Sequence, residues 1–453
     1  MSFFSTNLLF FVVVNFGAVL LTVFENLRDT NQRFSVLLRW LVPPAAGLVA
    51  MVWNNDPVLI AGMTFLSFLF ILYAGKKMPD ILYGGHLLVF SLCGLIIAGC
   101  GYAFLFFSGI DVSWFTRIFV FGLMGVGLIL APIGLIETWK IWETLLRRKW
   151  KRPRQPLEAT RKQVLPKVSI HIPTYSEPPE IVIQTLNKIN DLRYANYEVI
   201  VIDNNTPDPS LWKPVELHCR KLGEKFRFFH ISPLEGAKAG ALNVAFTHTA
   251  PDAEFIGVVD ADYHVNADWI CRLIDYFDDP AIGFVQPPHA YREWENNPYL
   301  RMCNWEYKLF FETHAKSLNE YDSALTVGTL CLIRKKALED AGLWSEWCLT
   351  EDSELAIRIH RAGYSSVFIN ENFGHGLIPE TYHGFRKQRF RWAYGPVQEL
   401  KKHFRFYLPR PFAKKSGLTR FQKLFHMSHG MAQISFLAGY IFSILSVFTA
   451  GSM

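Results

Sequence analysis

Long apolar stretches fill the first third of the chain, and polar residues return only in short segments between them. Five stretches have the composition of membrane helices: residues 5–24, 34–53, 58–73, 82–107 and 115–136. Each approaches the ~20 residues that an α-helix needs to cross ~30 Å of hydrocarbon. A sixth apolar stretch, residues 427–448, follows the polar part of the chain. The pattern predicts a helical membrane bundle, with five spans in residues 1–145 and a sixth in residues 425–453.

Charged residues between these stretches predict the orientation of the bundle. Basic side chains follow the first, third and fifth stretches, at Arg28, Arg33, Lys76, Lys77 and within residues 147–154. The intervening loops, residues 54–56 and 108–113, contain no Lys or Arg. Because cytoplasmic loops are enriched in basic residues, we expect the N-terminus outside and residue 146 onward in the cytoplasm. The protein is thus predicted to cross an inner or plasma membrane several times.

Short runs rich in Val, Ile and Phe alternate with helical stretches in the polar part of the chain. The runs predict strands at residues 168–175, 197–203, 226–231, 255–262 and 282–286. The stretches between them predict helices at residues 179–190, 208–222, 236–247 and 267–277. This alternation predicts a mostly parallel, doubly wound sheet of the Rossmann type. We expect residues 146–384 to form a cytosolic α/β domain that binds its ligand at the carboxyl ends of the strands.

Acidic and hydroxyl residues gather at these strand ends. The first strand ends in residues 173–177, the second in residues 203–206 and the fourth in Asp260-Ala261-Asp262. A single Asp in such a place is more often a turn or helix cap than a ligand. Three strands that bring carboxylates to one edge favour a binding site. Asp260 and Asp262 offer the oxygen ligands that Mg²⁺ and Mn²⁺ prefer.

A segment rich in small residues, Glu235–Asn243, follows the third predicted strand. Its Lys238 lies near the start of a predicted helix, where an anionic group would be stabilised. The same composition also fits an ordinary strand-to-helix turn. The spacing matches neither a P-loop nor the G-x-G-x-x-G pattern, so it argues against an ATPase and a dehydrogenase.

Two further motifs lie near the end of the polar region. Thr350-Glu351-Asp352 begins a predicted helix, where acidic residues are also common as caps. Gln388-x-x-Arg391-Trp392 begins a basic, amphipathic stretch, residues 385–424, in which Pro396 is expected to break or start a helix. Beside a membrane span, this composition predicts a segment that lies on an anionic bilayer surface. We expect no nucleic-acid partner, because dense basic charge occurs only in two membrane-adjacent stretches.

The composition excludes two other classes of protein. Half of the 453 residues are apolar, which excludes a disordered chain. The 7 cysteines form no CxxC pair and no zinc spacing, so we expect neither a disulfide framework nor structural zinc.

Taken in order, the motifs resemble those of membrane-embedded family 2 glycosyltransferases, the group of the cellulose, hyaluronan and chitin synthases. Five motifs carry the resemblance: Asp203, Lys238 in Ala-Lys-Ala-Gly-Ala-Leu-Asn, Asp260-Ala261-Asp262, Thr350-Glu351-Asp352 and Gln388-x-x-Arg391-Trp392. The resemblance extends over residues 167–402 and includes the flanking membrane spans. It implies a GT-A-like domain that transfers sugar from a UDP-sugar to a growing polysaccharide, with Mg²⁺ or Mn²⁺ as cofactor.

The resemblance also implies a role for each residue. Donor binding is expected of Thr174, Tyr175, Glu177, Asp203, Lys238, Asp260 and Arg391. Asp260 and Asp262 would hold the metal, and Asp352 would take the proton from the acceptor hydroxyl in a single displacement that inverts α to β. Acceptor contacts are expected of His289, Glu351 and Trp392. The motif that closes the site comprises Gln388, Arg391 and Trp392.

The preferred donor is UDP-glucose and the preferred product a β-glucan that crosses the membrane, as in a bacterial β-1,3- or cyclic β-glucan synthase. Only one predicted span follows the catalytic region. We therefore expect either that further C-terminal helices follow in a longer protein, or that the five N-terminal helices or a partner subunit build the channel. Three alternatives stay open. They are a poly-N-acetylglucosamine or chitin-type synthase, a transferase of a single sugar to a lipid carrier, and a transporter with a nucleotide-sugar sensing domain.

Overall fold

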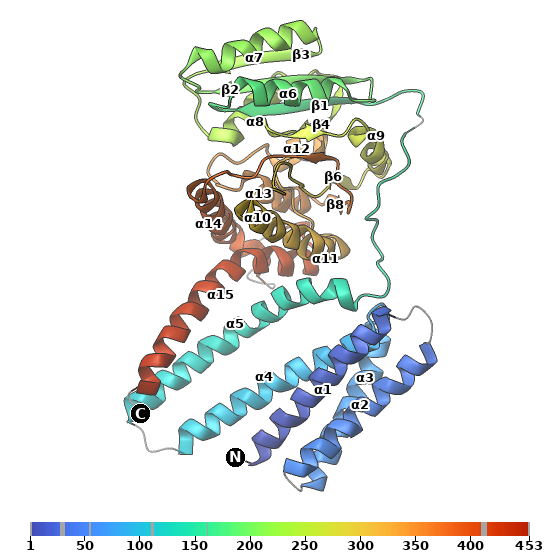
Figure 1. Ribbon diagram of the computed structural model, residues 1–453, viewed down its shortest axis with the longest axis vertical. Coiled ribbons are helices and arrows are strands. Elements are labelled where there is room, and N and C mark those ends of the chain that lie inside the picture. Colours follow the sequence, from blue (N-terminus) through green and yellow to red (C-terminus); the bar gives the residue numbers. More distant parts are fainter. Residues whose placement is uncertain are drawn as a thin grey trace. The chain divides into compact units, whose positions relative to one another are not determined.

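The computed structural model describes residues 2–27, 32–53, 56–109, 113–160, 162–408 and 415–451 (Figure 1). The chain divides into two compact units. One comprises Met1–Lys151 with Ser435–Met453, and the other comprises Arg152–Ile434.

Five helices make up most of the first unit: α1 (Ser2–Leu27), α2 (Gln32–Trp53), α3 (Pro57–Lys77), α4 (Tyr83–Gly109) and α5 (Trp114–Leu146). Among the described residues, α1, α3, α4 and α5 are long and apolar enough to cross a membrane, and α2 contributes a shorter apolar segment, Leu37–Val52. The sixth predicted span falls within α15 (Arg420–Gly451), part of which lies outside the residues whose side chains are described. The second and sixth spans and the orientation therefore stay predictions.

Helices α1 and α4 pack closely through small residues. A Cβ atom at Gly84 would lie 2.8 Å from the carbonyl oxygen of Ala18, and one at Gly94 would lie 2.1 Å from the ring of Phe11. Since apolar burial drives little association between helices in lipid, such close packing is what holds membrane helices together.

A seven-stranded sheet forms the centre of the second unit. Its strands are β1 (Lys167–Thr174), β2 (Tyr197–Asn204), β3 (Phe226–Ile231), β4 (Ala253–Val258), β6 (Ile282–Gln286), β7 (Leu332–Arg334) and β8 (Ser365–Phe368). The spatial order is β3-β2-β1-β4-β7-β6-β8. β7 runs antiparallel to its neighbours β4 and β6, and the other pairs are parallel. The prediction of a mostly parallel α/β domain is thus confirmed.

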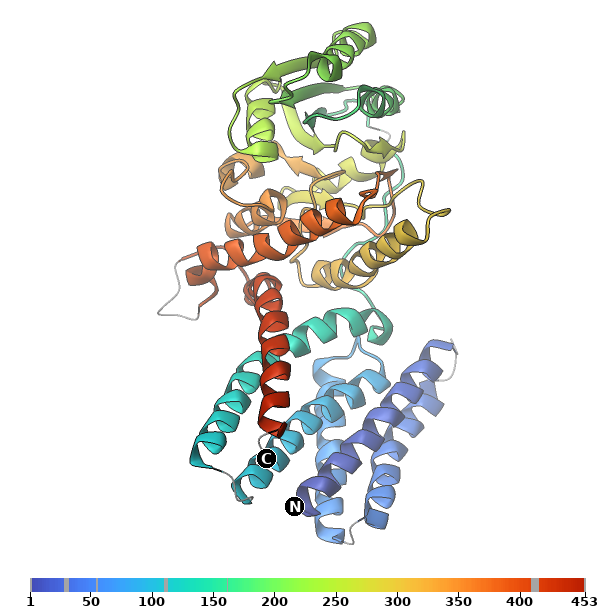
Figure 2. The ribbon, with the colours of Figure 1, turned by 60° about the vertical axis from the view of Figure 1, so that its left-hand side comes forward.

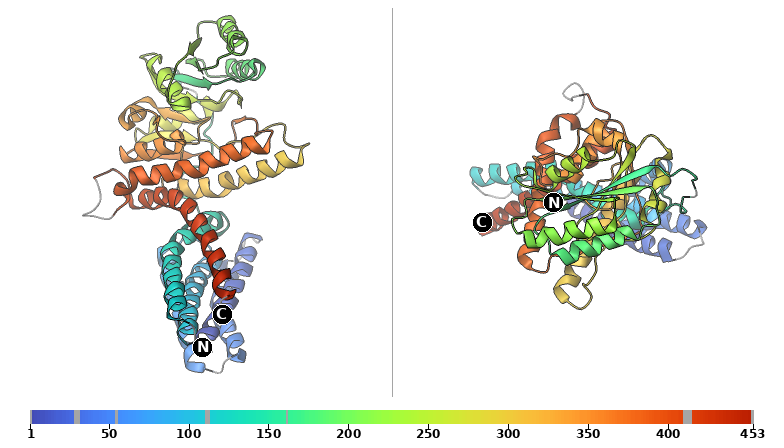
Figure 3. Two further views of the ribbon diagram at one scale, coloured as in Figure 1. Left: turned by 90° about the vertical axis from the view of Figure 1, so that its left-hand side faces the viewer. Right: turned by 90° about the horizontal axis from the view of Figure 1, so that it is seen from above.

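Helices cover both faces of the sheet (Figure 3). On one face, Val199 and Val201 of β2 pack in the same core as α6 (Pro179–Asn190) and α7 (Pro209–Leu222). On the other face, Ile200 and Ile202 pack against α8 (Ala237–Thr247). Every residue of β2 is buried, which explains why its sequence lacks the polar alternation of a half-exposed strand.

The remaining elements continue the same unit. They are β5 (His264–Val265), α9 (Trp269–Leu273), a 3₁₀ turn (Ile274–Asp278), α10 (Pro298–Leu309), a π-helical turn (Phe310–Ala315), α11 (Lys316–Glu320), α12 (Lys335–Ala341), α13 (Glu351–Arg361), β9 (Gly374–His375) and α14 (Tyr382–Tyr407). Rings of α10 and α14 are in contact, and Figure 2 shows the two helices from the side.

One predicted helix boundary is wrong. We expected Pro396 to break or start a helix, but α14 runs through it without interruption. Pro396 is buried, and its carbonyl oxygen would lie 2.5 Å from a Cβ atom at Gly430 of α15. The proline removes one N–H donor from the interior of α14, and close packing against α15 accompanies it.

Candidate active site

The carboxylate of Asp203 lies at the end of β2 and is almost fully buried. Its Oδ1 accepts hydrogen bonds from the hydroxyl groups of Thr174 (3.2 Å) and Thr206 (2.6 Å), and its Oδ2 lies 2.6 Å from Nδ1 of His230. The imidazole of His230 stacks on Trp212 with 4.4 Å between ring centroids, and 27% of this histidine side chain is exposed. These five residues, here termed the Asp203 cluster, combine a buried carboxyl group with an accessible aromatic surface.

Lys238 joins two of the predicted motifs. Its Nζ donates a hydrogen bond to Oδ1 of Asp260 (2.5 Å) and another to the carbonyl oxygen of Gly328 (3.0 Å). The backbone N–H of Asp260 donates to Oγ1 of Thr329 (3.0 Å), which fixes the turn after β4. Burial disfavours the charged form of Lys238, but the neighbouring carboxylates outweigh burial and raise its pKa. The lysine is therefore a firmly held cation.

Gly328 marks the point where these motifs meet Asp352. A Cβ atom at Gly328 would lie 2.9 Å from Oδ2 of Asp352 and 3.2 Å from Nζ of Lys238. The glycine also has a φ of +89°, a conformation that other residues rarely adopt. Lys238, Asp260, Gly328, Glu351 and Asp352 are here termed the transfer cluster, because one cation and three carboxyl groups gather around a position that a side chain would fill.

The acids of the transfer cluster titrate above their ordinary range. Burial and the neighbouring Asp352 raise the pKa of Glu351 to about 7, against the opposing effect of Lys238. Burial also raises the pKa of Asp352, whose Oδ1 accepts a hydrogen bond from the backbone N–H of Ser353 (2.8 Å). A raised pKa brings a carboxylate closer to the basicity that proton transfer at neutral pH requires.

Asp262 lies beside this cluster with Glu177. The Oδ2 atom of Asp262 accepts a hydrogen bond from the backbone N–H of Leu377 (2.9 Å), and burial and the charge of Asp260 raise its pKa. Burial and the two aspartates raise the pKa of Glu177 to about 7. Such concentrated negative charge fits a divalent cation. Within the described residues, no three His, Cys, Asp or Glu side chains are grouped as metal ligands, so Mg²⁺ or Mn²⁺ would need ligands from substrate or water as well.

The first turns of α14 carry the predicted closing motif. Oε1 of Gln388 accepts a hydrogen bond from the hydroxyl group of Tyr307 (2.5 Å), and the rings of Trp392 and Tyr307 meet edge to face at 5.6 Å. Arg389, which was not predicted, lies between three rings, with its guanidinium carbon 4.5 Å from Tyr307, 4.8 Å from Phe385 and 4.5 Å from Trp392. The motif is therefore anchored to α10 by an aromatic cage around a cation.

Tyr291 connects this cage with the acids. Its ring packs against Tyr307 at 4.7 Å between centroids. Burial, and after it the surrounding charges that include Asp262 and Asp260, raises its pKa far above the ordinary value. Ring contacts therefore run from Tyr291 through Tyr307 to Trp392.

Residues 169–342 match the family described as "Glycosyl transferase family 2". This chain carries a family 2 glycosyltransferase domain. The family expected from the motifs is thereby confirmed, and the mixed sheet with flanking helices is its GT-A-like fold.

Curated relatives of the glycosyltransferase domain include two plant proteins. The chain is 27% identical over 299 residues to glucomannan 4-beta-mannosyltransferase 1 of Cyamopsis tetragonoloba, which covers 63% of this chain and 56% of that protein. It is 27% identical over 273 residues to probable glucomannan 4-beta-mannosyltransferase 7 of Oryza sativa subsp. japonica, covering 58% of this chain and 46% of that protein. The chain spans about half the length of the curated relatives that it matches.

Two solved structures are also similar. The mannosyltransferase PcManGT from Pyrobaculum calidifontis, in complex with GDP-Man and Mn²⁺, aligns with a TM-score of 0.48 and 19% identity over 72% of this chain and 90% of that one. Residues 1–349 of S. aureus TarS, in complex with UDP-GlcNAc, align with a TM-score of 0.41 and 14% identity over 59% of this chain and 72% of that one.

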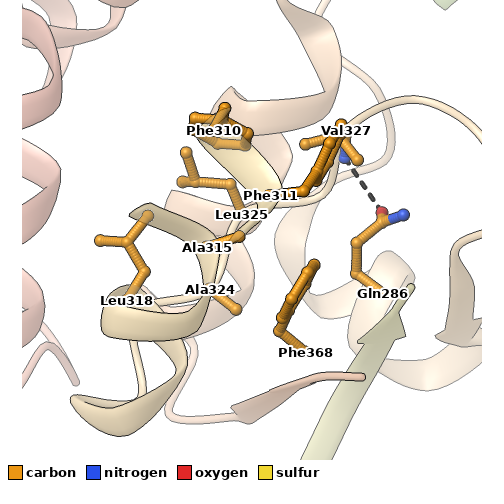
Figure 4. A pocket seen from close by; sticks show the side chains of 9 residues that line it. All are labelled: Gln286, Phe310, Phe311, Ala315, Leu318, Ala324, Leu325, Val327 and Phe368. Atoms are coloured by element: carbon orange, nitrogen blue, oxygen red, sulfur yellow. Dashed lines mark hydrogen bonds between the residues drawn. The ribbon is translucent and has the colours of Figure 1, made fainter. Parts of the chain in front are cut away.

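A small apolar pocket of the glycosyltransferase domain lies beside the loop that carries Gly328. It is lined by Gln286, Phe310, Phe311, Ala315, Leu318, Ala324, Leu325, Val327 and Phe368 (Figure 4). Oε1 of Gln286 accepts a hydrogen bond from the backbone N–H of Val327 (3.0 Å), and its Nε2 donates to the carbonyl oxygen of Thr329 (2.9 Å). The pocket is too apolar for a sugar nucleotide, but Gln286 holds the Gly328 loop in place.

The remaining predicted residues of the glycosyltransferase domain take no part in the hydrogen bonds of these clusters. Tyr175 and Arg391 are exposed. His289 packs against Phe311 at 5.1 Å between ring centroids, and burial lowers its pKa to about 4. Its Nε2 atom is buried and has no hydrogen-bond partner, which leaves a donor or acceptor for a hydroxyl-bearing ligand.

His230, Trp212 and Arg389 are the residues that sequence reasoning missed. The third predicted strand did end at residue 231, so its register with the second strand could have pointed to His230, which lies opposite Asp203. Trp212 and Arg389 stand out only once α7 and α14 are folded against their neighbours.

Proposed function

We propose that this protein is an inverting glycosyltransferase that moves a hexose from a nucleotide sugar onto a growing β-linked polysaccharide. The observation that carries the proposal is the transfer cluster, in which Lys238, Asp260 and Asp352 converge on Gly328. A cation for a diphosphate and a carboxylate for a hydroxyl proton are the two groups that such a displacement requires.

Donor binding begins with the nucleoside. The ring pair of His230 and Trp212 offers a stacking surface for the base, and the buried carboxylate of Asp203 orients His230. Lys238 would then contact the diphosphate. Phosphate oxygens would replace Asp260 as the partner of the Lys238 ammonium group. The positive charge of Lys238 would then be balanced both before and after the donor binds.

Transfer follows as a single displacement. Asp352 accepts the proton of the acceptor hydroxyl while that oxygen forms a bond to the anomeric carbon. The bond from this carbon to the diphosphate oxygen breaks at the same time, and the nucleoside diphosphate leaves. Attack from the opposite face converts an α-linked donor into a β-linked product.

The metal is proposed to lie at Asp262 and Asp260, with Glu177 nearby. A bound Mg²⁺ or Mn²⁺ neutralises the negative charge that grows on the departing diphosphate. The raised pKa values of Glu177 and Asp262 fit this role, because a cation would favour their ionised forms.

The acceptor is proposed to lie along the aromatic residues of α10 and α14. Trp392, 36% exposed, provides a platform for a sugar ring, and Glu351 and His289 provide polar contacts. Arg391 is available for the diphosphate of the closed site. The apolar helices of the first unit would anchor the enzyme in a bilayer, with the catalytic unit in the cytoplasm and the N-terminus outside.

The donor divides into two candidates. The sequence motifs favour UDP-glucose and a β-glucan, whereas the named activity of the plant relatives is 4-β-mannosyl transfer. We therefore place UDP-glucose first and a mannosyl donor second. The transfer cluster is compatible with either hexose, because glucose and mannose differ only in the orientation of the hydroxyl group at C2.

The test is release of nucleoside diphosphate by the full chain in nanodiscs. UDP-glucose, GDP-mannose, UDP-N-acetylglucosamine and UDP-glucuronate are supplied in turn with Mg²⁺ or Mn²⁺, and the products are digested with linkage-specific β-glucanases and a β-mannanase. Release from UDP-glucose with a glucanase-sensitive polymer supports the first candidate, and release from GDP-mannose with a mannanase-sensitive polymer supports the second. A short glycolipid would favour the lipid-carrier alternative. Nucleotide binding without transfer from any donor would reject the enzyme and favour a sensing domain.

A further inference from the structure

A buried glutamate of α14 contacts the segment that carries the proposed base. Glu399 is 2% exposed, and its Oε1 atom accepts hydrogen bonds from the hydroxyl groups of Thr350 (2.6 Å) and Ser353 (2.5 Å). These two residues directly flank Glu351 and Asp352. One carboxyl oxygen therefore ties down both ends of the turn that presents Asp352 to the transfer cluster.

The contact replaces an ordinary helix cap. Thr350 is the N-cap residue of α13, yet its side chain makes no capping hydrogen bond within the helix. Its hydroxyl group points to Glu399 instead. The start of α13 is thus oriented by a neighbouring helix rather than by its own N-terminal residue.

Two further residues of α14 hold the same segment. A Cβ atom at Gly395 would lie 2.1 Å from Oγ1 of Thr350, so the helix backbone itself packs on this threonine. Oε1 of Gln398 accepts a hydrogen bond from the backbone N–H of Leu349 (3.1 Å), and its Nε2 donates to the carbonyl oxygen of Trp347 (3.3 Å). Residues 347–353 are therefore fixed at four points by one face of α14.

We propose that Glu399 is a positioning residue for Asp352, and that α14 unites this role with the closing motif on its first turns. The inference rests on the proposed function, because it assigns Asp352 the role of base. A displacement of the base by ~1 Å slows the reaction on the order of 100-fold. Loss of the contacts that position Asp352 should therefore lower the rate of transfer. Glu399 acts through Thr350 and Ser353 and does not itself reach the cluster by any described hydrogen bond.

The surroundings of Glu399 favour its protonated form, which suits a neutral hydrogen-bonding role. Burial raises its pKa to about 8, and the acids facing it, Asp352 and Glu354, add to this increase. Cys348 and Tyr407 also face it, and burial raises the pKa of both groups. A protonated Glu399 does not add a further negative charge next to Asp352.

The experiment compares Glu399→Leu, which removes the acceptor atom, with Glu399→Gln, which keeps a carbonyl oxygen in its place. Lys401→Leu, on an exposed position of the same helix, is the matched control. For each variant in nanodiscs, kcat and the donor KM are measured with the best donor, and hydrogen exchange is followed at the backbone amides of residues 350–354.

We expect Glu399→Leu to lower kcat by roughly 10- to 100-fold with little change in donor KM, and to speed exchange at residues 350–354 but not in β1 or β2. Glu399→Gln should retain most of the activity, and Lys401→Leu all of it. Wild-type kcat in Glu399→Leu, or equal loss in both Glu399 variants, would overturn the inference.

An inactive wild-type chain and an unfolded variant are interpreted separately. If the wild-type chain transfers no sugar, the proposed function fails, but the exchange measurement still decides whether Glu399 orders residues 350–354. If Glu399→Leu does not fold, Thr350→Val serves in its place, because it removes one hydroxyl group and keeps the shape. Unchanged kcat and exchange in Thr350→Val would then count against the proposal.

Discussion

The Asp203 cluster and the transfer cluster differ in the surroundings that they give to their buried carboxyl groups. The carboxylate of Asp203 has three hydrogen-bonding partners, the side chains of Thr174, Thr206 and His230. The transfer cluster places Asp260, Glu351 and Asp352 around a single cation, Lys238, and both Glu351 and Asp352 have raised pKa values. The first arrangement is complete before any ligand arrives, whereas the second has excess negative charge that a bound cation would relieve. Under the proposed function, donor recognition takes place in the first cluster and the transfer step in the second.

The largest effect should come from removing the base. Asp352→Asn keeps the size of the side chain but cannot accept the proton, so we expect kcat to fall about 10³-fold while nucleotide affinity stays unchanged. Nucleoside diphosphate release and calorimetric binding of the nucleotide measure the two quantities. Asp252→Asn, at an exposed position before β4, is the control. Equal loss of binding and transfer would show that the two clusters do not work separately.

A smaller effect is expected at the other cluster. His230→Ala removes a hydrogen bond to Asp203 and the ring that stacks on Trp212, so the donor KM should rise about tenfold with little change in kcat. Steady-state kinetics over donor concentration provide the measurement. His218→Ala, on the neighbouring α7, should leave KM unaltered. A fall in kcat at unchanged KM would move His230 into the transfer step.

The smallest effect is on the pH dependence of stability. The folded-state pKa of Glu351, about 7, exceeds its ordinary value of 4.5, so its contribution to stability is greatest below pH 4.5 and is lost as the pH rises through about 7. Glu351→Gln does not ionise. Its apparent melting temperature should therefore rise relative to wild type between about pH 5 and about pH 8. A difference in melting temperature that stays constant over this pH range would mean that the pKa of Glu351 is not raised in the folded protein.

Much of this fold follows from local patterns in the sequence. The apolar runs that predicted strands coincide with β1, β2, β3, β4 and β6, although β4 ends at Val258, before the acids that were included in it. Strands β7 and β8 have only three and four residues, too few to establish a period of two. Their places depend on pairing with β6, which links residues distant in sequence.

The residues of the site could be predicted less completely from the sequence than the strands. Acids at strand ends and at the start of a helix were visible because each lies beside a regular apolar pattern. Arg389 was missed because its role arises from a contact with Tyr307, which no spacing along the chain reveals. His230 could have been found from the register of the second and third predicted strands, which places it opposite Asp203. Glu399 appears as one acid in a basic helix until its burial against Thr350 is seen.

Helix α14 imposes a condition on the construction of chimaeric glycosyltransferases. Its first turns contain Gln388 and Trp392, and its middle turns form hydrogen bonds with the loop before Asp352. A closing motif transplanted from another enzyme would therefore bring foreign side chains to positions 395, 398 and 399 if the whole helix were exchanged. Residues 347–353 and 382–407 contact each other through these side chains. A chimaera that exchanges both segments together therefore preserves the contacts between them.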